Sequence, residues 1–315
     1  MWSIPIALSL LELIDSMDVD RAEGVLLGLA CGDALGRPVE FKSPREIEGR
    51  HGQLTEMVGN GTWSQPAGII TDDTEQALCI ARSLNEYRKF DPADIATRFV
   101  QWYETGPFDI GIMTRKSLQA LQSGDSWEQA GELVWKNSQE GENAGNGSVM
   151  RSPPLALMFF DEPKRLIESS RHCSRITHAD PRCTYGCAVL NLTIAGILRD
   201  ESSPLETALD KVRKDAPNEL IEALDVVVHG DAPSLSTSGY VIDTLQTALH
   251  DGLGGADAED AIVTAVNRGG DADTIGAITG AVAGARFGAE SLPARWVAAL
   301  DERDELEGLA AGLVN

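Results

Sequence analysis

Residues 267–285 read NRGGDADTIGAITGAVAGA, and the predicted architecture is built around this stretch. From Thr274 onward it contains almost only small and apolar residues, and Gly276, Gly280 and Gly284 recur every fourth position. Residues at this spacing share one face of a helix, where glycine lets a neighbouring backbone come close. The apolar run is too short to cross a bilayer. We therefore expect a central, buried helix that lies tightly against its neighbours.

Most other periodic segments of the chain are also typical of helices. The predicted helices are Asp20–Leu35, Asp72–Tyr87, Pro92–Glu104, Ser126–Asn137, Cys183–Leu198, Ser236–His250, Asp257–Val266 and Pro293–Leu313. Loops rich in Gly, Pro and Asn are expected at 36–70, 105–111, 138–153 and 230–236. Aromatic residues make up 5% of the chain, and no alternating run is long enough to seed a sheet. The sequence therefore predicts one compact all-α domain.

The N-terminal segment 1–16, MWSIPIALSLLELIDS, has the apolar character of a signal sequence. However, no basic residue precedes its apolar run, Glu12 interrupts that run, and the run is too short to span a bilayer. The segment is interpreted either as an accessory helix or as an artefact of the start site, with Met17 opening the true chain. We assign 1–19 to an N-terminal extension and 20–315 to the domain, and we expect a cytoplasmic protein without membrane contacts.

Charge is the most unusual bulk property of the chain. Asp and Glu total 49 against 26 Lys and Arg, which gives a net charge of −23. Dispersed acidity of this kind resembles that of salt-adapted, halophilic proteins, in which high ionic strength screens the self-repulsion. Simple solubility is the alternative interpretation. In either case a nucleic-acid backbone would be repelled, so nucleic acid is not expected as a partner.

The cysteines do not indicate a disulfide framework, because they are odd in number and form no CxxC pair. They are Cys31, Cys79, Cys173, Cys183 and Cys187. Three of them cluster in sequence with His172 and His178, a composition that suits zinc, but the spacing matches no common zinc pattern.

Two short acidic clusters stand at predicted helix starts, TDDT at 71–74 and DADT at 271–274. One such cluster alone would be explained as an N-cap. Two of them would bury four carboxylates, whose repulsion requires compensation. Two divalent cations, about 4 Å apart, would neutralise this charge. Because the ligands are carboxylate and hydroxyl oxygens, Mg²⁺ or Mn²⁺ is favoured over Zn²⁺.

A third element is the loop NAGNGSVMR at 143–151. Alternating glycine and short polar residues leave backbone N–H groups free to surround a phosphate or diphosphate. The loop is not a P-loop, because Gly-Lys-Ser/Thr is absent. In isolation such a loop is more often a surface turn.

Together these segments resemble the ADP-ribosylglycohydrolase family, the relatives of the glycohydrolase that reactivates dinitrogenase reductase. The matching motifs appear in family order over about residues 20–290. They are GDALGRPVEF at 32–41, TDDT at 71–74, DIG at 109–111, GNGSVMR at 145–151, THADPR at 177–182, SGYVIDTLQTAL at 238–249 and NRGGDADTIGAITGAVAGA at 267–285.

The resemblance implies an all-α orthogonal multi-helix bundle with a binuclear Mg²⁺ or Mn²⁺ site in a cleft. The implied metal ligands are Thr71, Asp72, Asp73, Asp271, Asp273 and Thr274. The implied contacts to the diphosphate and ribose are Asn143, Gly145, Asn146, Gly147 and His178, with Tyr240 beside the distal nucleoside. Glu40 and Asp109 match the family's two carboxylates near the metals and the substrate. Arg151 and Arg182 are left outside the site as anchors of core carboxylates.

Two departures from the family pattern leave the implied ligands intact. Ala144 stands where some relatives have an aromatic residue, which weakens the expected stacking on adenosine. Arg37 stands where relatives often have a small residue, and we expect it to alter access to the cleft.

The resemblance implies an enzyme that hydrolyses the glycosidic bond between ADP-ribose and a modified side chain or small molecule. The bond would break through an oxocarbenium-like state, with Glu40 as general base and Asp109 acting on the leaving group, or with these roles reversed. The expected partner is an ADP-ribosylated protein or conjugate. The alternatives are a non-catalytic ADP-ribose binder, a crystallin-like structural member of the family, and a metal-dependent phosphohydrolase. The leaving group and the oligomeric state stay open.

Overall fold

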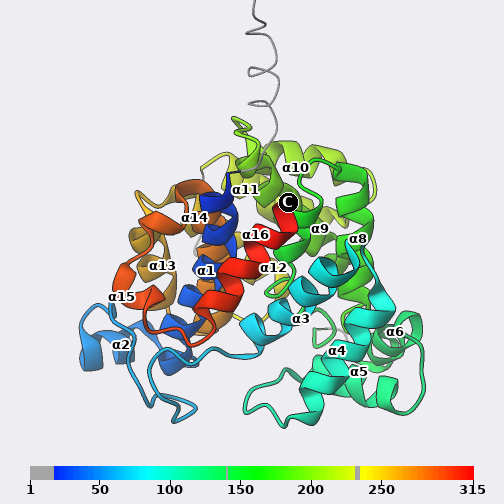
Figure 1. Cartoon of the computed structure of the whole chain (residues 1–315), viewed down its shortest axis with the longest axis horizontal. Helices are drawn as coiled ribbons and strands as arrows, with labels where there is room; N and C mark the ends of the chain where they lie inside the picture. The colour runs from blue at the N-terminus through cyan, green and yellow to red at the C-terminus, as the bar shows by residue number, and fades with distance from the viewer. Residues whose placement is uncertain (1–17, 140, 231–234) are drawn as a thin grey trace, which may run out of the picture.

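The computed structural model describes residues 18–139, 141–230 and 235–315, so the extension predicted at 1–19 lies almost wholly outside the described residues. Within the described ranges there are sixteen α-helices and no strand, which confirms the all-α prediction (Figure 1). The helices are α1 (Val19–Gly36), α2 (Pro44–His51), α3 (Asp72–Tyr87), α4 (Pro92–Glu104), α5 (Ile112–Gln122), α6 (Trp127–Asn137), α7 (Pro154–Met158), α8 (Pro163–Arg175), α9 (Pro181–Leu198), α10 (Pro204–Val212), α11 (Asn218–Val228), α12 (Val241–Gly254), α13 (Ala258–Asn267), α14 (Ala272–Phe287), α15 (Ala294–Val297) and α16 (Arg303–Val314). Short 3₁₀ turns, η2 (Arg37–Val39) and η3 (Ala289–Ser291), follow α1 and α14.

Helices α1 and α14 lie against each other in antiparallel directions at the centre of the molecule. A Cβ atom added to Gly28 would lie 2.2 Å from the carbonyl oxygen of Gly280, and one added to Gly280 would lie 1.9 Å from that of Gly28. The same close approach recurs one turn away, between Gly32 and Gly276 and between Gly24 and Gly284. Only glycine allows two helix backbones to touch in this way.

The central position predicted for the Thr274–Gly288 segment is therefore confirmed, and its partner is α1. The four glycines of α1 that contact α14 are Gly24, Gly28, Gly32 and Gly36. They have the same four-residue spacing as those of α14. Every residue of α14 from Ala272 to Ala285 is buried, as expected of a helix that is apolar on all sides.

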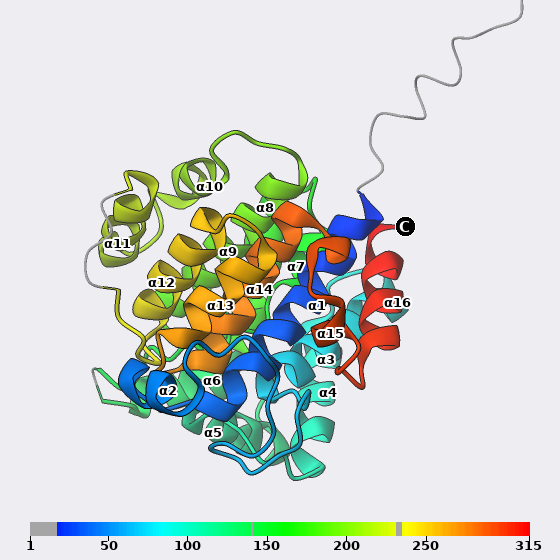
Figure 2. The same cartoon turned by 90° about the vertical axis from the view of Figure 1, so that its left-hand side faces the viewer.

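The remaining helices surround this pair. Helices α12 and α13 pack on α14, while α3 and α16 pack on α1 from another side (Figure 2). Helix α9 is flanked by α8 and α10, and α4, α5 and α6 form a smaller group at one end. In the part of the chain that the structure describes, no helix is both long and apolar enough to cross a membrane.

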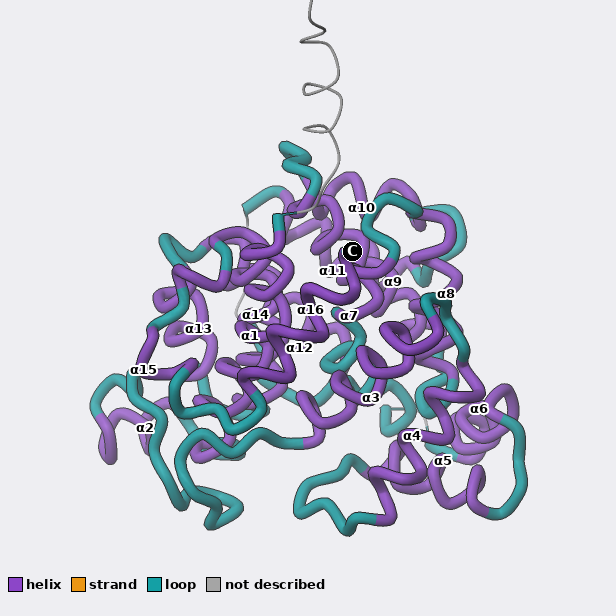
Figure 3. The backbone as a smooth tube through the Cα atoms, viewed as in Figure 1, coloured by secondary structure: helices purple, strands orange, loops and turns teal. Residues whose placement is uncertain are grey.

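Two loops reach the same end of the bundle, one at 52–71 and one at 105–111 (Figure 3). They meet through the rings of Trp63 and Phe108, whose centroids are 5.9 Å apart. The predicted loop 36–70 also contains α2, whose start is fixed by a capping box between Ser43 and Glu46. That pair of residues is a recognisable start signal in the sequence.

Arg37 holds the first of these loops from inside. Its side chain is fully buried and donates hydrogen bonds to the carbonyl oxygens of Ile69, Asn60 and Pro66, at 3.0, 3.2 and 2.7 Å. The guanidinium of Arg37 points into the protein and binds backbone, so an effect of Arg37 on access to the cleft would act through this loop and stays a prediction.

The prediction of a single helix at Pro293–Leu313 is wrong, since α15 and α16 are separate. The turn between them is held against the first loop. A Cβ atom on Gly68, which has a φ of +81°, would lie 2.0 Å from the carbonyl oxygen of Ala299. Periodicity alone does not reveal a break that is imposed by a contact with a distant loop.

The backbone contact between α1 and α14 makes a testable prediction. Gly280→Ala places a methyl group against the Gly28 carbonyl, so the helices must separate, and the free energy of unfolding should fall by about 3 kcal/mol. Urea denaturation of the purified variant measures this change.

Gly308→Ala is the matched control, because Gly308 lies within α16 with open space around its Cβ position. That variant should gain about 0.5–1 kcal/mol from the better helix propensity of alanine. Equal effects of the two substitutions would contradict the proposed role of the glycine contact.

Candidate functional site

The N-termini of α3 and α14 meet beside the C-terminal end of α1. Asp33, on α1, accepts hydrogen bonds from the backbone N–H groups of Thr71 and Thr74, and a bond of 2.5 Å from the Thr74 hydroxyl. These bonds fix the start of α3 onto α1. The contact between Gly36 and Ala272 brings the start of α14 to the same place. The two acidic motifs therefore converge because both helices begin at α1.

The convergence lines a cavity of about 500 Å³. The predicted site residues that line it are Glu40, Asp72, Asp73, Asp109, Gly145, Asn146, Gly147, His178, Asp271, Asp273 and Thr274. Phe41, Trp63, Ile110, Ile112 and Glu142 complete much of the remaining wall. None of the described residues that line the cavity is a lysine or an arginine. The described part of the cavity wall is therefore strongly acidic and has no cationic side chain to balance it.

Three carboxylates come closest together. Glu40, Asp271 and Asp273 each offer an oxygen atom, and these atoms lie within 4.8 Å of one another. Nearby, the Oδ1 atom of Asp73 is buried and has no hydrogen-bond partner in the structure. A buried carboxylate oxygen normally has a partner, so this atom marks a place where a ligand would be expected.

Burial and mutual repulsion disturb the acidity of these groups. Burial, with repulsion by Asp109, raises the pKa of Glu40 to about 8. Burial, with repulsion by Asp33, raises the pKa of Asp109 to about 7. Burial also raises the pKa of Asp73 and Asp273 well above the usual range, with neighbouring carboxylates adding to the effect. Keeping these buried carboxylates charged therefore costs free energy, and a bound positive charge would reduce that cost.

The glycine-rich loop closes one side of the cavity. The amide of Asn146 donates a bond of 2.7 Å to Asp271 Oδ2, and its backbone N–H donates to the carbonyl of Gly239 at 3.1 Å. The His178 ring lies against this loop, since a Cβ atom on Gly147 would be 3.0 Å from its Cε1. Burial, with the nearby Arg151 charge, lowers the pKa of His178 to about 3, so the imidazole is neutral.

Three predicted site residues do not line the cavity. Thr71 is fully buried behind Asp73, to which its hydroxyl donates at 3.2 Å. Asn143 and Tyr240 instead contact Arg182, which donates to the Asn143 side chain at 3.1 Å and to the Tyr240 hydroxyl at 3.4 Å. Metal binding by Thr71 and substrate contacts of Asn143 and Tyr240 stay predictions. Arg182 itself binds the Asp180 carboxylate at 2.8 Å, as expected of an anchoring arginine.

Three residues of this site were not predicted from the sequence. Asp33 is the buried acceptor that orients α3, and an acid within an apolar helix was a usable signal. Trp63 donates a bond of 2.5 Å to the Glu40 carboxylate, and nothing in the sequence indicated that contact. Thr114 is buried beside Gly147, and its hydroxyl has no partner in the structure.

The cysteines take no part in the acidic cluster. All five are free and buried. Cys183 donates to the carbonyl of Gly145 at 3.2 Å, and Cys187 donates to the Ser148 hydroxyl at 3.5 Å. The only His, Cys, Asp or Glu group found in the described residues with metal-binding geometry is the acidic one, which gives no support to zinc.

Comparison with known proteins gives consistent results. The family model for ADP-ribosylglycohydrolase matches residues 15–315. The chain is 33% identical to the ADP-ribosyl-(dinitrogen reductase) glycohydrolase of Rhodospirillum rubrum, covering 91% of this chain and 92% of that protein. It is 34% identical to the ADP-ribosylarginine hydrolase Tri1 of Pseudomonas putida, covering 94% and 78% respectively. A solved structure titled ADP-ribosylglycohydrolase-related protein complex superimposes with a TM-score of 0.78 at 38% identity, covering 94% and 97% of the two chains.

The raised pKa values predict how the stability of the cation-free protein depends on pH. The folded protein binds protons to these carboxyl groups more tightly than the unfolded chain, whose groups titrate near about pH 4. The free energy of unfolding should therefore fall as pH rises toward the pKa of Glu40, about 8. Thermal melts in excess chelator, between about pH 5 and about pH 8, measure this slope.

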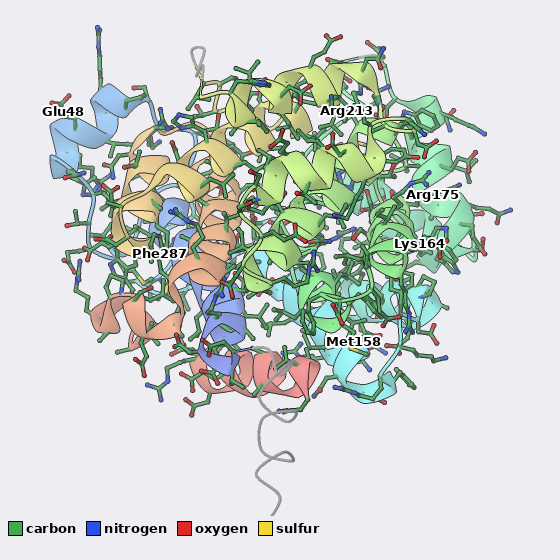
Figure 4. All side chains as sticks on the ribbon, turned by 90° about the horizontal axis from the view of Figure 1, so that it is seen from above. Glu48, Met158, Lys164, Arg175, Arg213 and Phe287 are labelled. Atoms are coloured by element: carbon green, nitrogen blue, oxygen red, sulfur yellow. The ribbon has the colours of Figure 1, made fainter. Side chains whose placement is uncertain are left out.

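Asp73→Asn removes one of the carboxyl groups whose pKa is raised in the folded protein, so its melting temperature at the alkaline end should exceed that of the wild type by several degrees. Glu48→Gln is the control, because Glu48 lies exposed at the outer edge of α2 (Figure 4). A variant of Asp73 that follows the wild-type slope would show that the buried cluster does not carry the effect.

Proposed function

The chain belongs to the ADP-ribosylglycohydrolase family, and from this premise we propose that it removes ADP-ribose from a conjugate in a reaction that requires divalent cations. It is an enzyme, a hydrolase that acts on glycosyl bonds. The observation that carries the proposal is the acidic cavity, where oxygen atoms of Glu40, Asp271 and Asp273 lie within 4.8 Å of one another and the described lining has no lysine or arginine. Neither a purely structural protein nor a simple nucleotide binder requires such a costly arrangement.

The residues present fit a pair of divalent cations. Carboxylate and hydroxyl oxygens are the donors that Mg²⁺ and Mn²⁺ prefer, and the unpartnered Oδ1 of Asp73 is such a donor. We propose that the residues that would hold the cations are Thr71, Asp72, Asp73, Asp271, Asp273 and Thr274. Thr71 and Thr274 now donate to Asp73, at 3.2 and 3.4 Å, so their hydroxyl oxygens stand at the cluster.

Bound divalent cations would supply a Lewis acid that holds ribose hydroxyls and makes water more acidic. Glu40 borders this cluster and accepts a hydrogen bond from Trp63. Its proton would leave once positive charge is bound beside it, because the repulsion that raises its pKa would be offset. We assign Glu40 to orienting and deprotonating the attacking water.

Asp109 lines the cavity from the loop before α5. Its pKa of about 7, raised by burial, suits a group that gives up a proton near neutrality. We assign Asp109 to orienting or protonating the leaving group. The acidic wall also stabilises positive charge on the ribose as the glycosidic bond breaks.

The glycine-loop side of the cavity supplies uncharged donors for a diphosphate. The Gly145–Gly147 loop, the neutral His178 and the unpartnered Thr114 hydroxyl lie together there. A Cβ atom on Gly147 would lie 3.3 Å from the Thr114 hydroxyl, so glycine leaves room for a ligand. In this arrangement the cations would neutralise the charge of the diphosphate, and the hydrogen-bond donors of the loop would orient it.

The cavity wall favours a cationic leaving group. Its described lining combines Glu40, Asp109 and Glu142 with the aromatic rings of Phe41 and Trp63. Acidic and aromatic groups together attract a guanidinium, whereas a serine hydroxyl has no charge to match them. We propose an ADP-ribosylated arginine side chain of a protein as the substrate, in agreement with the name of the Pseudomonas putida relative.

The direct test is release of free ADP-ribose from arginine-linked and serine-linked substrates assayed in parallel with Mg²⁺ or Mn²⁺. We expect release from the arginine conjugate, loss on chelation, and at least a ~100-fold loss in Asp273→Asn. Glu48→Gln should keep wild-type activity. AMP as the product would identify a phosphohydrolase instead, and ADP-ribose binding without turnover would identify a binding protein.

Substitution of Glu40 tests its assignment as the base. Glu40→Gln keeps the size of the side chain but removes the base, so kcat should fall by about 10²–10⁴-fold while KM changes little. Trp63→Phe removes only the hydrogen bond to Glu40, so its loss should be smaller. Near-full turnover by Glu40→Gln would exclude this role and transfer it to Asp109.

A further inference from the structure

Arg151 is a fully buried arginine that the proposed reaction does not use. Its guanidinium lies 4.3 Å from the centroid of the Phe99 ring, and its Nε atom has no hydrogen-bond partner. Its guanidinium donates hydrogen bonds to two uncharged side chains, Gln76 and Thr177, the second at 2.6 Å. No carboxylate of the described residues forms an ion pair with it. Burying an unpaired charge is expensive, so this residue calls for an explanation.

The two hydrogen bonds of Arg151 lead to two different residues of the cavity wall. Gln76 accepts from Arg151 through Oε1, and its amide nitrogen donates to Asp72 Oδ2 at 3.1 Å. Thr177 accepts from Arg151 through Oγ1, which lies 2.7 Å from Nδ1 of His178. One buried guanidinium thus connects a carboxylate of the acidic cluster with the imidazole beside the glycine-rich loop.

The donor and acceptor roles in this chain follow from its chemistry. A guanidinium has only donors, so the Thr177 oxygen must accept from Arg151. The single hydroxyl proton is then best used on Nδ1 of His178, because a buried donor left without an acceptor is costly. A neutral imidazole that accepts at Nδ1 carries its proton on Nε2. Nε2 faces the glycine loop, 3.2 Å from a Cβ position on Gly147.

The same argument applies to the other branch. Because Arg151 can only donate, it must meet the oxygen of the Gln76 amide, which leaves the NH₂ group to donate to Asp72. Arg151 therefore determines which way round the Gln76 amide lies. In doing so it directs the amide NH₂ of Gln76 at the Asp72 carboxylate, whose charged form is destabilised by burial and by repulsion from Asp109.

We propose that Arg151 is a positioning residue that holds His178 as the Nε2-protonated neutral tautomer, a fixed donor toward the bound anion, and that orients Asp72 through Gln76. The identity of that anion as the diphosphate of ADP-ribose rests on the proposed function. The tautomer and its cause do not, since they follow from the contacts of Arg151 and Thr177.

The test uses Thr177, because removing Arg151 itself would leave a large buried gap. Thr177→Val replaces the hydroxyl by a methyl group of similar size, and Thr177→Ser restores the hydroxyl. Nitrogen-15 NMR of histidine-labelled protein reports which ring nitrogen carries the proton, and a His178→Asn sample identifies the signal. We expect Nε2–H for His178 in the wild type and in Thr177→Ser, and a shift toward the other tautomer in Thr177→Val.

A proton on Nδ1 in the wild type would overturn the proposal without any variant being needed. An unchanged His178 spectrum in a folded Thr177→Val protein would overturn it as well, because the hydroxyl would then not set the tautomer. A merely structural role for Thr177 would alter stability but would leave the ring protonation as it is.

Binding of free ADP-ribose in the presence of Mg²⁺, measured by calorimetry, tests the consequence. Thr177→Val should bind about tenfold more weakly, and Thr177→Ser should recover most of the wild-type affinity. Equal binding by the valine and serine variants would contradict the positioning role. Failure of the wild type to bind ADP-ribose would count against the proposed function alone, because the NMR result is independent of any ligand.

Discussion

The close contact between the backbones of α1 and α14 is the constraint on which the site depends. Glycines at every fourth position of both helices remove the side chains that would hold them apart. As a result the C-terminal end of α1, with Asp33, lies directly against the first turn of α14, with Asp273. Asp33 in turn fixes the start of α3, with Asp72 and Asp73, through backbone hydrogen bonds. The packing of small residues between α1 and α14 therefore also brings the acidic residues together.

This arrangement of α1, α3 and α14 places like charges together in a buried cavity, and those charges must be balanced. The described cavity lining contains no lysine or arginine, and the buried guanidinium of Arg151 reaches the cavity residues only through Gln76 and Thr177. In the proposed function, bound cations would stabilise the charged form of Asp73, Asp271 and Asp273. The uncharged donors at the glycine loop would complement them in this proposal, because an anionic substrate whose charge is balanced by cations needs orientation more than additional charge.

Much of this organisation is visible in the sequence, for physical reasons. The glycine spacing of 276–284 predicts a buried helix, and two acidic helix starts predict a shared site, because both patterns are local. The partner face on α1 has the same spacing and could have been found. The hydrogen bond from Trp63 to Glu40 and the turn that divides α15 from α16 could not, since they depend on a loop packed against distant residues. Tyr240 and Asn143 likewise turn toward Arg182, a choice that is made by tertiary contacts.

The most direct test of the central claim is a titration of cation-free protein with Mn²⁺, followed by the electron paramagnetic resonance signal of the free ion. We expect tight, saturable binding of two ions per chain, which is lost in Asp73→Asn but kept in Glu48→Gln. Weak binding that does not saturate, or binding that is equally tight in both variants, would show that the buried carboxylates are not a cation site.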